Sequence, residues 1–505
     1  MGLLDLPPEL LDLVIEVTAP HGLENFVLSC KAVFERAKSQ IKRHNALKKT
    51  WSHATNASLA RRGDTLNILY EISREPIIAE YITSLSLWDQ RVDGQMPKEP
   101  MEDDFRKDET AMMKIKALLQ NSDYSALIDQ DEWWQQILDE DAAGEDTSVD
   151  KLYATVALLA LLPNLKTLQL PDRWHEVRRD EAAESLVPAV ESLIRMSNTS
   201  RSARRPLSSL ETLLPFVEEG YDVRVSLQCI QPFMCLNSVR NLYAVSCVAL
   251  EDDWSNMPFE WPTSLKSPLT RIELASCCID AGALSVLLSN TPAVTIFRYS
   301  HQTKWDGLET YWNPVAFLEV IANYLGNQLQ ELAITIDELH GEVVNGLSSF
   351  MRFVKLEKLE VDVAVFCGPP LESGQRRGRN AYTPDGAASW VHNDIPCMGD
   401  MLPDSIRELH VNTDYPHPSK DALHALFKNI KVRREDKLIN LKKTVIRQYR
   451  LSTAREMAEM HEATLEVFDE VVAEPRPRSI MPQWKREFDA RVGGIVMTTD
   501  ELTYW

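Results

Sequence analysis

The first fifty residues carry apolar side chains at a helical spacing. Two prolines open the run, and they suit the start of a helix because the first amide groups there have no partner. Behind them Leu10, Leu11, Val14 and Ile15 form one broad apolar stripe, and a second amphipathic run covers residues 23–38. The pattern predicts two or three short helices, which bury too little surface to be very stable without a neighbour or partner.

A different pattern begins near residue 81, where the motif L-x-x-L-x-L recurs with variations. Its eight copies cover residues 82–87, 165–170, 239–244, 269–274, 294–299, 329–334, 356–361 and 406–411. From Leu242 to Leu359 the middle apolar positions are 30, 25, 35 and 27 residues apart. Each copy reads as a turn and strand that hides its apolar side chains by stacking on its neighbours. Helical stretches such as 281–288 and 315–325 fill the gaps and are expected on the convex side.

These patterns predict an α/β fold, in which an N-terminal helical hook is followed by an irregular leucine-rich-repeat-like solenoid, or horseshoe, with a helical C-terminal cap. The expected parts are a helical domain over 1–48, a helical connector over 49–80, the solenoid over 81–415 with insertions near 89–150 and 367–401, the cap over 416–472 and a tail over 473–505. A cap is expected because the last repeat needs a polar cover. Its Lys442, Lys443, Arg447 and Arg450 are expected at exposed positions, and the tail is either partly disordered or folded back through Trp484 and Trp505.

The two insertions have different compositions. The first holds Trp133 and Trp134 among carboxylates, and it is either a solvated helix with both tryptophans packed on the solenoid or a recognition loop. The second contains the Gly- and Arg-rich stretch 373–380, which has no periodicity and is expected to be a mobile surface loop.

The N-terminal run LPPELLDLVIE followed by GLENFVLSCKAVFERA resembles the F-box of filamentous fungal proteins. Phe34 stands where that family often has Trp, and Ser29–Cys30 stands where it has Val-Ser or Val-Cys. The resemblance implies docking on the Skp-family adaptor and cullin of an SCF-type ubiquitin ligase. The residues expected to bind the adaptor are Leu6, Pro7, Pro8, Glu9, Leu10, Leu11, Ile15, Leu23, Leu28, Cys30, Lys31 and Phe34. The alternative is an ordinary proline-started helix whose leucines join the main core.

Composition and charge limit the classes of partner that the chain is expected to bind. A formal charge of −21 argues against nucleic acid or an anionic membrane as a partner, because phosphate groups are bound by clustered Lys and Arg. The longest apolar run, residues 154–162, is far shorter than the ~20 residues that span a bilayer. The N-terminus does not have the pattern of a secretory signal, so we expect a cytoplasmic or nuclear protein with its eight cysteines as buried free thiols.

Motifs of catalysis are missing from the sequence. It contains no G-x-G-x-x-G, G-x-x-x-x-G-K-S/T, G-x-S-x-G or H-E-x-x-H, and its histidines at 410, 417 and 424 suit no metal knuckle. We therefore expect no catalytic residue, cofactor or metal. The expected function is a non-catalytic substrate-recognition adaptor of an SCF-type ligase that binds an unknown protein substrate. The alternative is a repeat scaffold that acts outside any ubiquitin ligase.

Overall fold

The computed structural model describes most of the chain. The described residues are 6–55, 65–88, 105–126, 128–143, 152–178, 183–199, 205–251, 255, 257–304, 311–338, 342–343, 349–365, 368–369, 373–375, 382–391, 394, 396–412, 420–449, 464–468 and 482–497. The chain divides into two compact units, one of Met1–Thr212 with Val496–Trp505 and one of Leu213–Ile495. The two units are taken in turn.

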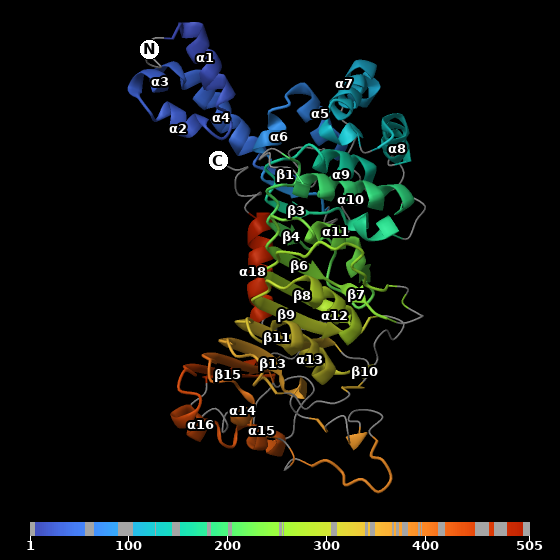
Figure 1. Cartoon of the computed structure of the whole chain (residues 1–505), viewed down its shortest axis with the longest axis vertical. Helices are drawn as coiled ribbons and strands as arrows, with labels where there is room; N and C mark the ends of the chain where they lie inside the picture. The colour runs from blue at the N-terminus through green and yellow to red at the C-terminus, as the bar shows by residue number, and fades with distance from the viewer. Residues whose placement is uncertain are drawn as a thin grey trace. The chain divides into compact units, whose positions relative to one another are not determined.

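The first unit combines helices with short parallel strands (Figure 1). Its helices are α1 (Pro8–Val17), α2 (Leu23–Val27), α3 (Lys31–Arg36), α4 (Lys38–Trp51), α5 (Thr65–Arg74), α6 (Ile78–Tyr81), α7 (Glu109–Gln120), α8 (Gln130–Ala143), α9 (Leu152–Leu159) and α10 (Ala183–Thr199), with 3-10 turns η2 (Phe105–Lys107), η3 (Asp123–Ala126) and η4 (Asp172–Arg178). Its strands β1 (His53–Thr55), β2 (Ser84–Ser86) and β3 (Thr167–Gln169) pair in parallel in chain order. Strand β4 (Thr212–Leu214) begins where this unit ends.

The N-terminal helices have a small core of their own. It consists of the buried side chains Leu11, Ile15, Leu23, Val27, Val33 and Ala37, with Ala19, Phe26, Cys30 and Ile41 packed against them. Helix α1 begins at Pro8 and α2 follows a short turn, so the apolar sides of three short helices meet. We call residues 6–51 the N-terminal segment.

The second unit is built on a large parallel sheet. The strands of this unit are β5 (Val225–Ser226), β6 (Asn241–Val245), β7 (Cys247–Ala249), β8 (Arg271–Ile279), β9 (Ile296–Gln302), β10 (Tyr311–Trp312), β11 (Glu331–Glu338), β12 (Glu342–Val343), β13 (Lys358–Asp362), β14 (Glu408–Asn412), β15 (Lys443–Tyr449) and β16 (Thr464–Phe468). Strands β10 and β12 pair with each other in a separate two-stranded sheet. The helices are α11 (Gln231–Met234), α12 (Ala281–Asn290), α13 (Pro314–Leu325), α14 (Met398–Met401), α15 (Lys420–Phe427), α16 (Ile430–Asp436) and α18 (Gln483–Met497), with 3-10 turns η5 (Leu227–Cys229) and η7 (Val363–Val365).

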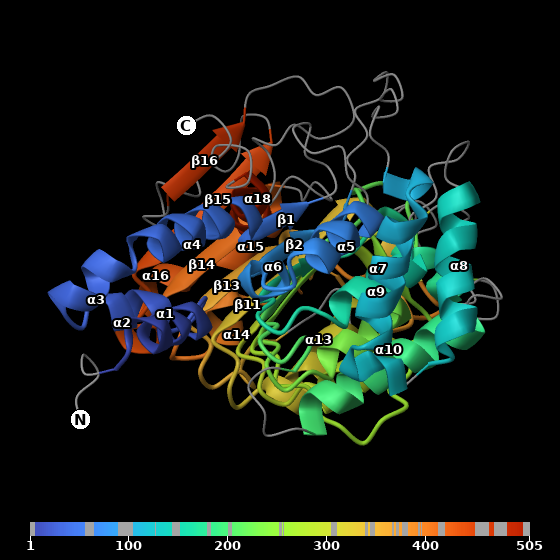
Figure 2. The same ribbon diagram turned by 90° about the horizontal axis from the view of Figure 1, so that it is seen from above.

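The main sheet of the second unit keeps one order and one direction. It runs β6-β8-β9-β11-β13-β14-β15-β16, all parallel, and Figure 2 shows β15 and β16 pointing the same way. The register aligns the middle apolar residues of six predicted motif copies in one buried row, Leu242, Ile272, Phe297, Leu332, Leu359 and Leu409. The eight copies all contain a strand, as the motif predicted, because alternate apolar residues can be buried on one side of a sheet.

Helices lie on both sides of this sheet. Helices α12 and α13 pack against each other beside the apolar row, whereas α18 runs along the opposite face, across β6 to β11 (Figure 1). We call this opposite side, formed by alternate residues of β6 to β15, the charged face. Its members are identified below.

The expected architecture of hook, open horseshoe and helical cap is wrong. The structure is an α/β fold with a large parallel sheet, and the cap region 416–472 contributes strands β15 and β16 to that sheet. The side of the sheet away from α12 and α13 is covered by α18, so the tail folds back through Trp484, which is fully buried. The connector expected to be helical over 49–80 also contains strand β1. Arg447, expected to be exposed, is buried, and the stretch 376–380 of the Arg-rich insertion lies outside the described residues.

Candidate binding surfaces

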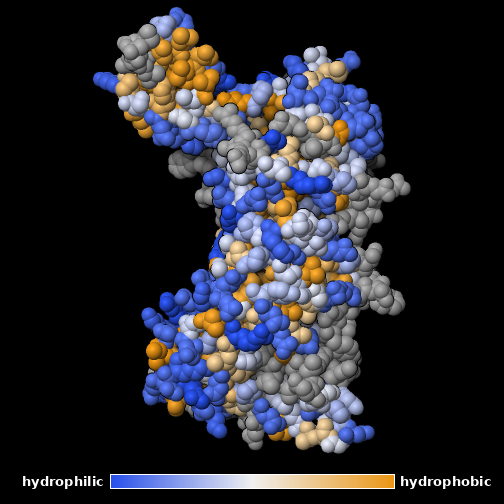
Figure 3. Space-filling view, viewed as in Figure 1, coloured by the Kyte–Doolittle hydropathy of each residue, from blue (hydrophilic) through white to orange (hydrophobic). Residues whose placement is uncertain are grey.

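Helix α1 has two apolar stripes instead of the single broad one expected. Leu11 and Ile15 lie four residues apart and point into the core of the N-terminal segment. Leu10, Leu13 and Val17 follow the spacing i, i+3, i+7 on another side, and their exposed fractions are 48%, 54% and 64%. A surface helix normally needs one apolar stripe, so the second is a candidate interface. Figure 3 shows apolar atoms gathered on this segment.

The twelve residues expected to bind an adaptor fall into three groups by burial. Leu11, Ile15 and Leu23 are buried in the core of the segment, and their expected contact with an adaptor stays a prediction. Cys30 and Leu6 are partly buried. The remaining members are exposed, and they are Pro7, Pro8, Glu9, Leu10, Leu28, Lys31 and Phe34.

An ion pair ties α3 to α1 beside these residues. The Arg36 guanidinium donates to both carboxylate oxygens of Asp12, with distances of 2.6 Å from Nε to Oδ1 and 2.7 Å from the second nitrogen to Oδ2. This hydrogen bonding holds the pKa of Asp12 below its ordinary value. The paired geometry fixes how α1 and α3 present their outer sides.

The charged face of the second unit carries ionisable side chains in register across the sheet. One row consists of Tyr243, Glu273, Arg298, Ala333, Glu360, His410 and Val445, on six successive strand pairs. Glu273, Arg298 and Glu360 are each at most 3% exposed. Charged side chains are rarely buried to this extent unless they are paired. The groups that pair with them therefore show what the charged face binds.

Helix α18 supplies partners at its N-terminus. Both Glu360 carboxylate oxygens accept backbone N–H groups there, from Gln483 at 2.7 Å and from Trp484 at 2.9 Å. Arg447 of β15 donates to the same carboxylate at 2.6 Å. Glu360 therefore satisfies two amide groups that a helix end leaves without internal partners.

A buried lysine anchors the next residue of α18. Lys485 Nζ lies 2.9 Å from Asp337 Oδ2, 3.0 Å from a Glu219 carboxylate oxygen and 3.1 Å from Ser276 Oγ. Burial alone would lower the pKa of Lys485, but the two carboxylates outweigh burial and raise it. Burial would likewise raise the pKa of Asp337, but Lys485 and hydrogen bonds from Ser300 and Ser276 hold it below its ordinary value. Both groups are thus charged at neutral pH.

A third cluster lies one helical turn further along. Glu487 accepts from Arg298 at 2.9 Å and from Lys358 at 3.0 Å, and Arg491 donates to Glu273 at 2.8 Å. Burial opposes ionisation of Glu487, yet these cations lower its pKa to about 2. Between the charges, Trp484 and Phe488 pack on apolar members of the face, and the Trp484 indole N–H donates to Thr335 at 3.0 Å.

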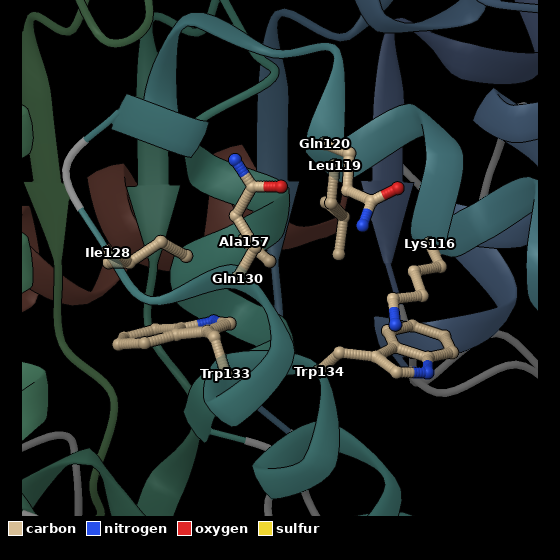
Figure 4. A pocket seen from close by; sticks show the side chains of 8 residues that line it. All are labelled: Lys116, Leu119, Gln120, Ile128, Gln130, Trp133, Trp134 and Ala157. Atoms are coloured by element: carbon tan, nitrogen blue, oxygen red, sulfur yellow. The ribbon is translucent and has the colours of Figure 1, made fainter.

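The tryptophans of the first insertion lie beside a small cavity. Trp133 is buried, packs edge-on against Tyr153 at 4.8 Å between ring centroids and donates to its backbone carbonyl. Trp134, Lys116 and neighbouring side chains surround a cavity of about 10 Å³ (Figure 4). That space suits at most one water molecule. The residues form a helix packed by its tryptophans, which is the first of the two alternatives.

The described cysteines form no disulfide bond. Five of them are buried, as predicted, and they are Cys229, Cys235, Cys247, Cys277 and Cys278, whereas Cys30 and Cys397 are only partly buried. Within the described ranges no group of three or more His, Cys, Asp and Glu side chains is arranged to hold a metal ion. No described helix has the length and apolar character needed to cross a bilayer.

Sequence reasoning missed both Leu13 with Val17 and the entire charged face. The first pair was visible as a second helical spacing in α1. The face had a signal too, because Glu273, Arg298, Glu360 and His410 occupy the position between the last two apolar residues of their motif copies. No model of a known protein family matches this chain, and no curated protein matches it.

Proposed function

We propose that the chain is the substrate-recognition subunit of an SCF-type ubiquitin ligase and that its N-terminal segment docks on the Skp-family adaptor. The observation that carries the proposal is the second apolar stripe of α1, formed by Leu10, Leu13 and Val17. Their exposure at positions next to the F-box-like run LPPELL supports a protein partner of that kind. The chain itself contributes no chemistry in this role, since it holds the substrate near subunits that transfer ubiquitin.

The energetics favour a measurable interface. Fully burying one exposed leucine side chain contributes about 1.5 to 3 kcal/mol. Leu10 and Leu13 are 48% and 54% exposed, so burying what remains of both contributes about 1.5 to 3 kcal/mol in total. That corresponds to a change in Kd of about tenfold to a hundredfold. Leu28 and Phe34, 75% and 41% exposed, add candidate apolar contacts on the next helices.

The test is co-purification of the full chain with the Skp-family adaptor and the cullin. The variant is Leu10→Asp with Leu13→Asp, and it leaves the buried Leu11 intact so that the segment keeps its core. The matched control is Ile439→Asp, which places the same charge on an apolar residue that is 71% exposed in the second unit. We expect the wild type and the control to bring down both subunits and the double variant to bring down neither.

Two results distinguish the alternatives. If the wild type brings down the adaptor without the cullin, the chain is a scaffold that uses the same docking residues outside the ligase. If the double variant and the control both retain the adaptor, the stripe is not the interface and the docking proposal is wrong.

A further inference from the structure

We propose that the charged face of the second unit is a binding site for an amphipathic helix and that α18 is its displaceable ligand, bound in cis. The inference does not depend on the ligase proposal, because it concerns α18 and the sheet of the second unit and uses no residue of the N-terminal segment. A helix from another protein with the same pattern of side chains would compete with α18 for this face.

The composition of the face is the first argument. A parallel sheet that its own helices cover permanently is apolar on both sides. Here the side toward α12 and α13 is apolar, whereas the side under α18 presents Glu273, Arg298, Lys358 and Glu360. Such a row has the character of a recognition surface, in which charged groups select a partner by complementary pairing.

The residues that surround Lys485 give the second reason, because part of their backbone is strained. Ser276 and Ser246 adopt φ angles of 53° and 54°, a region of backbone conformation that residues other than glycine seldom occupy. The Ser276 hydroxyl donates to Asp337 at 2.8 Å and contacts Lys485, while the Ser246 hydroxyl donates to the carbonyl of Glu218, next to Glu219. Strain of this kind gathers where a chain forms a site for a ligand.

The pattern of α18 is the third argument. Trp484, Phe488 and Arg491 follow the spacing i, i+4, i+7, and Lys485 and Glu487 flank them. Each of the five side chains meets a partner on the charged face, as described above. The ligand pattern is therefore aromatic, Lys, any residue, Glu, aromatic, followed three residues later by Arg.

Two glycines inside α18 weaken the helix, which favours its dissociation from the charged face. Gly493 and Gly494 follow each other inside α18, and glycine disfavours a helix interior. A side chain added at Gly493 would meet nothing within 4 Å, so no close packing requires glycine there. A helix weakened in this way dissociates from the sheet more readily than a helix without interior glycines.

The experiment measures binding of a labelled synthetic peptide of residues 482–497 to the full chain by fluorescence anisotropy. In the wild-type chain the tethered α18 competes at an effective concentration on the order of millimolar, which blocks a micromolar peptide. A chain with Trp484→Ala and Lys485→Met has weakened its own helix but keeps every receptor residue. We expect this chain to bind the peptide at least tenfold more tightly than the wild type does.

Two variant peptides and one variant chain define specificity. A peptide carrying Lys485→Met should bind the double-variant chain at least tenfold more weakly, whereas one carrying Gly493→Ala should bind about two- to fivefold more tightly. The chain variant Ala490→Ser, at an exposed position of α18, should behave as the wild type. If the folded double-variant chain binds no peptide, or binds the two peptides equally, the proposal is overturned.

Hydrogen exchange of the unmodified chain tests whether α18 dissociates from the sheet, even if the double variant does not fold. A displaceable α18 opens by itself, so we expect its amides to exchange at least tenfold faster than those of β8 and β9. If α18 and these strands exchange at the same rate, through global unfolding alone, α18 is a fixed part of the fold and the inference fails.

Discussion

The N-terminal segment and the charged face of the second unit reverse the usual distribution of side chains in opposite ways. The segment exposes Leu28 to 75% and Val17 to 64%. The face buries Glu273 completely and Glu360 to within 1%. Both departures are informative because apolar groups in water and charges away from water each cost free energy unless a partner is present.

The difference lies in where the partner comes from. The charges of the face are paired within the chain, since Lys485, Glu487 and Arg491 of α18 meet Asp337, Arg298 and Glu273. For the exposed stripe of α1 the described residues supply no such cover. The buried charges therefore have their partners within the chain, whereas the exposed stripe is the surface that we propose binds another protein.

The largest effect is expected for Glu360→Ala. Removing this carboxylate breaks its ion pair with Arg447, which is 2% exposed, and removes the acceptor of two backbone amide groups of α18. Breaking a buried pair from one side costs about 3 to 5 kcal/mol. Urea unfolding followed by circular dichroism measures the loss, and a loss below 1 kcal/mol would mean that α18 does not depend on this carboxylate.

The matched control is Glu357→Ala. Glu357 has a side chain that is 48% exposed and pairs with Arg407 at 3.6 Å. Surface pairs of this kind contribute about 0 to 1 kcal/mol. The contrast between Glu357 and Glu360 separates burial of a charge from the mere presence of an ion pair.

Leu11→Ala should give the next largest effect. Leu11 is 7% exposed and packs with Ile15 and Leu23, so the change removes buried methyl groups and leaves a cavity. Such substitutions cost about 2 to 5 kcal/mol, and a small core that can collapse favours the lower end. Hydrogen exchange of α1 to α3 would detect the loss, and an unchanged protection pattern would contradict the assignment of Leu11 to this core.

The strands were predictable because their signal is local. Each L-x-x-L-x-L copy places its own apolar residues on one side, and neighbouring copies pair in register, so Leu242 and Ile272 needed no knowledge of the rest of the chain. Strands β15 and β16 were not predicted. In β15, Lys443 and Arg447 lie four residues apart, which is also the spacing of one face of a helix. Pairing with β14 outweighs that local pattern.

The charged face could not be predicted from neighbouring residues, because its partners are distant in the sequence. Asp337 and Lys485 are 148 residues apart, and Glu360 and Trp484 are 124 apart. Carboxylates are frequent in this acidic chain, so nothing near Glu360 distinguished it from a solvated one. The α1 stripe was closer to prediction, since Leu10 was identified but was placed on the same side as Leu11.

Acid should weaken the charged face and leave the apolar stripe unchanged. The pKa of Glu487 is about 2 in the folded chain against an ordinary value of 4.5, so the unfolded chain binds the proton first as the pH falls. The stabilisation from Glu487 is complete above about pH 4.5 and is lost between there and pH 2. Unfolding of the wild type and of Glu487→Gln at pH 7 and pH 3 should differ less at pH 3, and an unchanged difference would show that Glu487 is not the group that titrates.

Gly493→Ala is expected to have a smaller effect, and one of opposite sign. Alanine is favoured over glycine in a helix interior by about 0.5 to 1 kcal/mol, and the added carbon meets nothing within 4 Å. Hydrogen exchange of α18 should slow by about two- to fivefold. The control is Gly326→Ala, where the added carbon would lie 2.5 Å from the Ala322 carbonyl oxygen and should destabilise the chain. Faster exchange of α18 in Gly493→Ala would mean that this glycine is needed for its own sake.

Leu28→Ser should change the free energy of unfolding least of all. With 75% of its surface exposed, Leu28 loses almost no packing within the chain, and surface substitutions usually stay within about 0.5 kcal/mol. The effect should appear only when the Skp-family adaptor is present, because a ligand at a hundred times its Kd stabilises the folded state by about 2.7 kcal/mol. Thermal unfolding of both chains with and without the adaptor measures this. We expect the adaptor to raise the Tm of the wild type more than that of Leu28→Ser, and an equal rise would place Leu28 outside the interface while leaving Leu10 and Leu13 to be tested by co-purification.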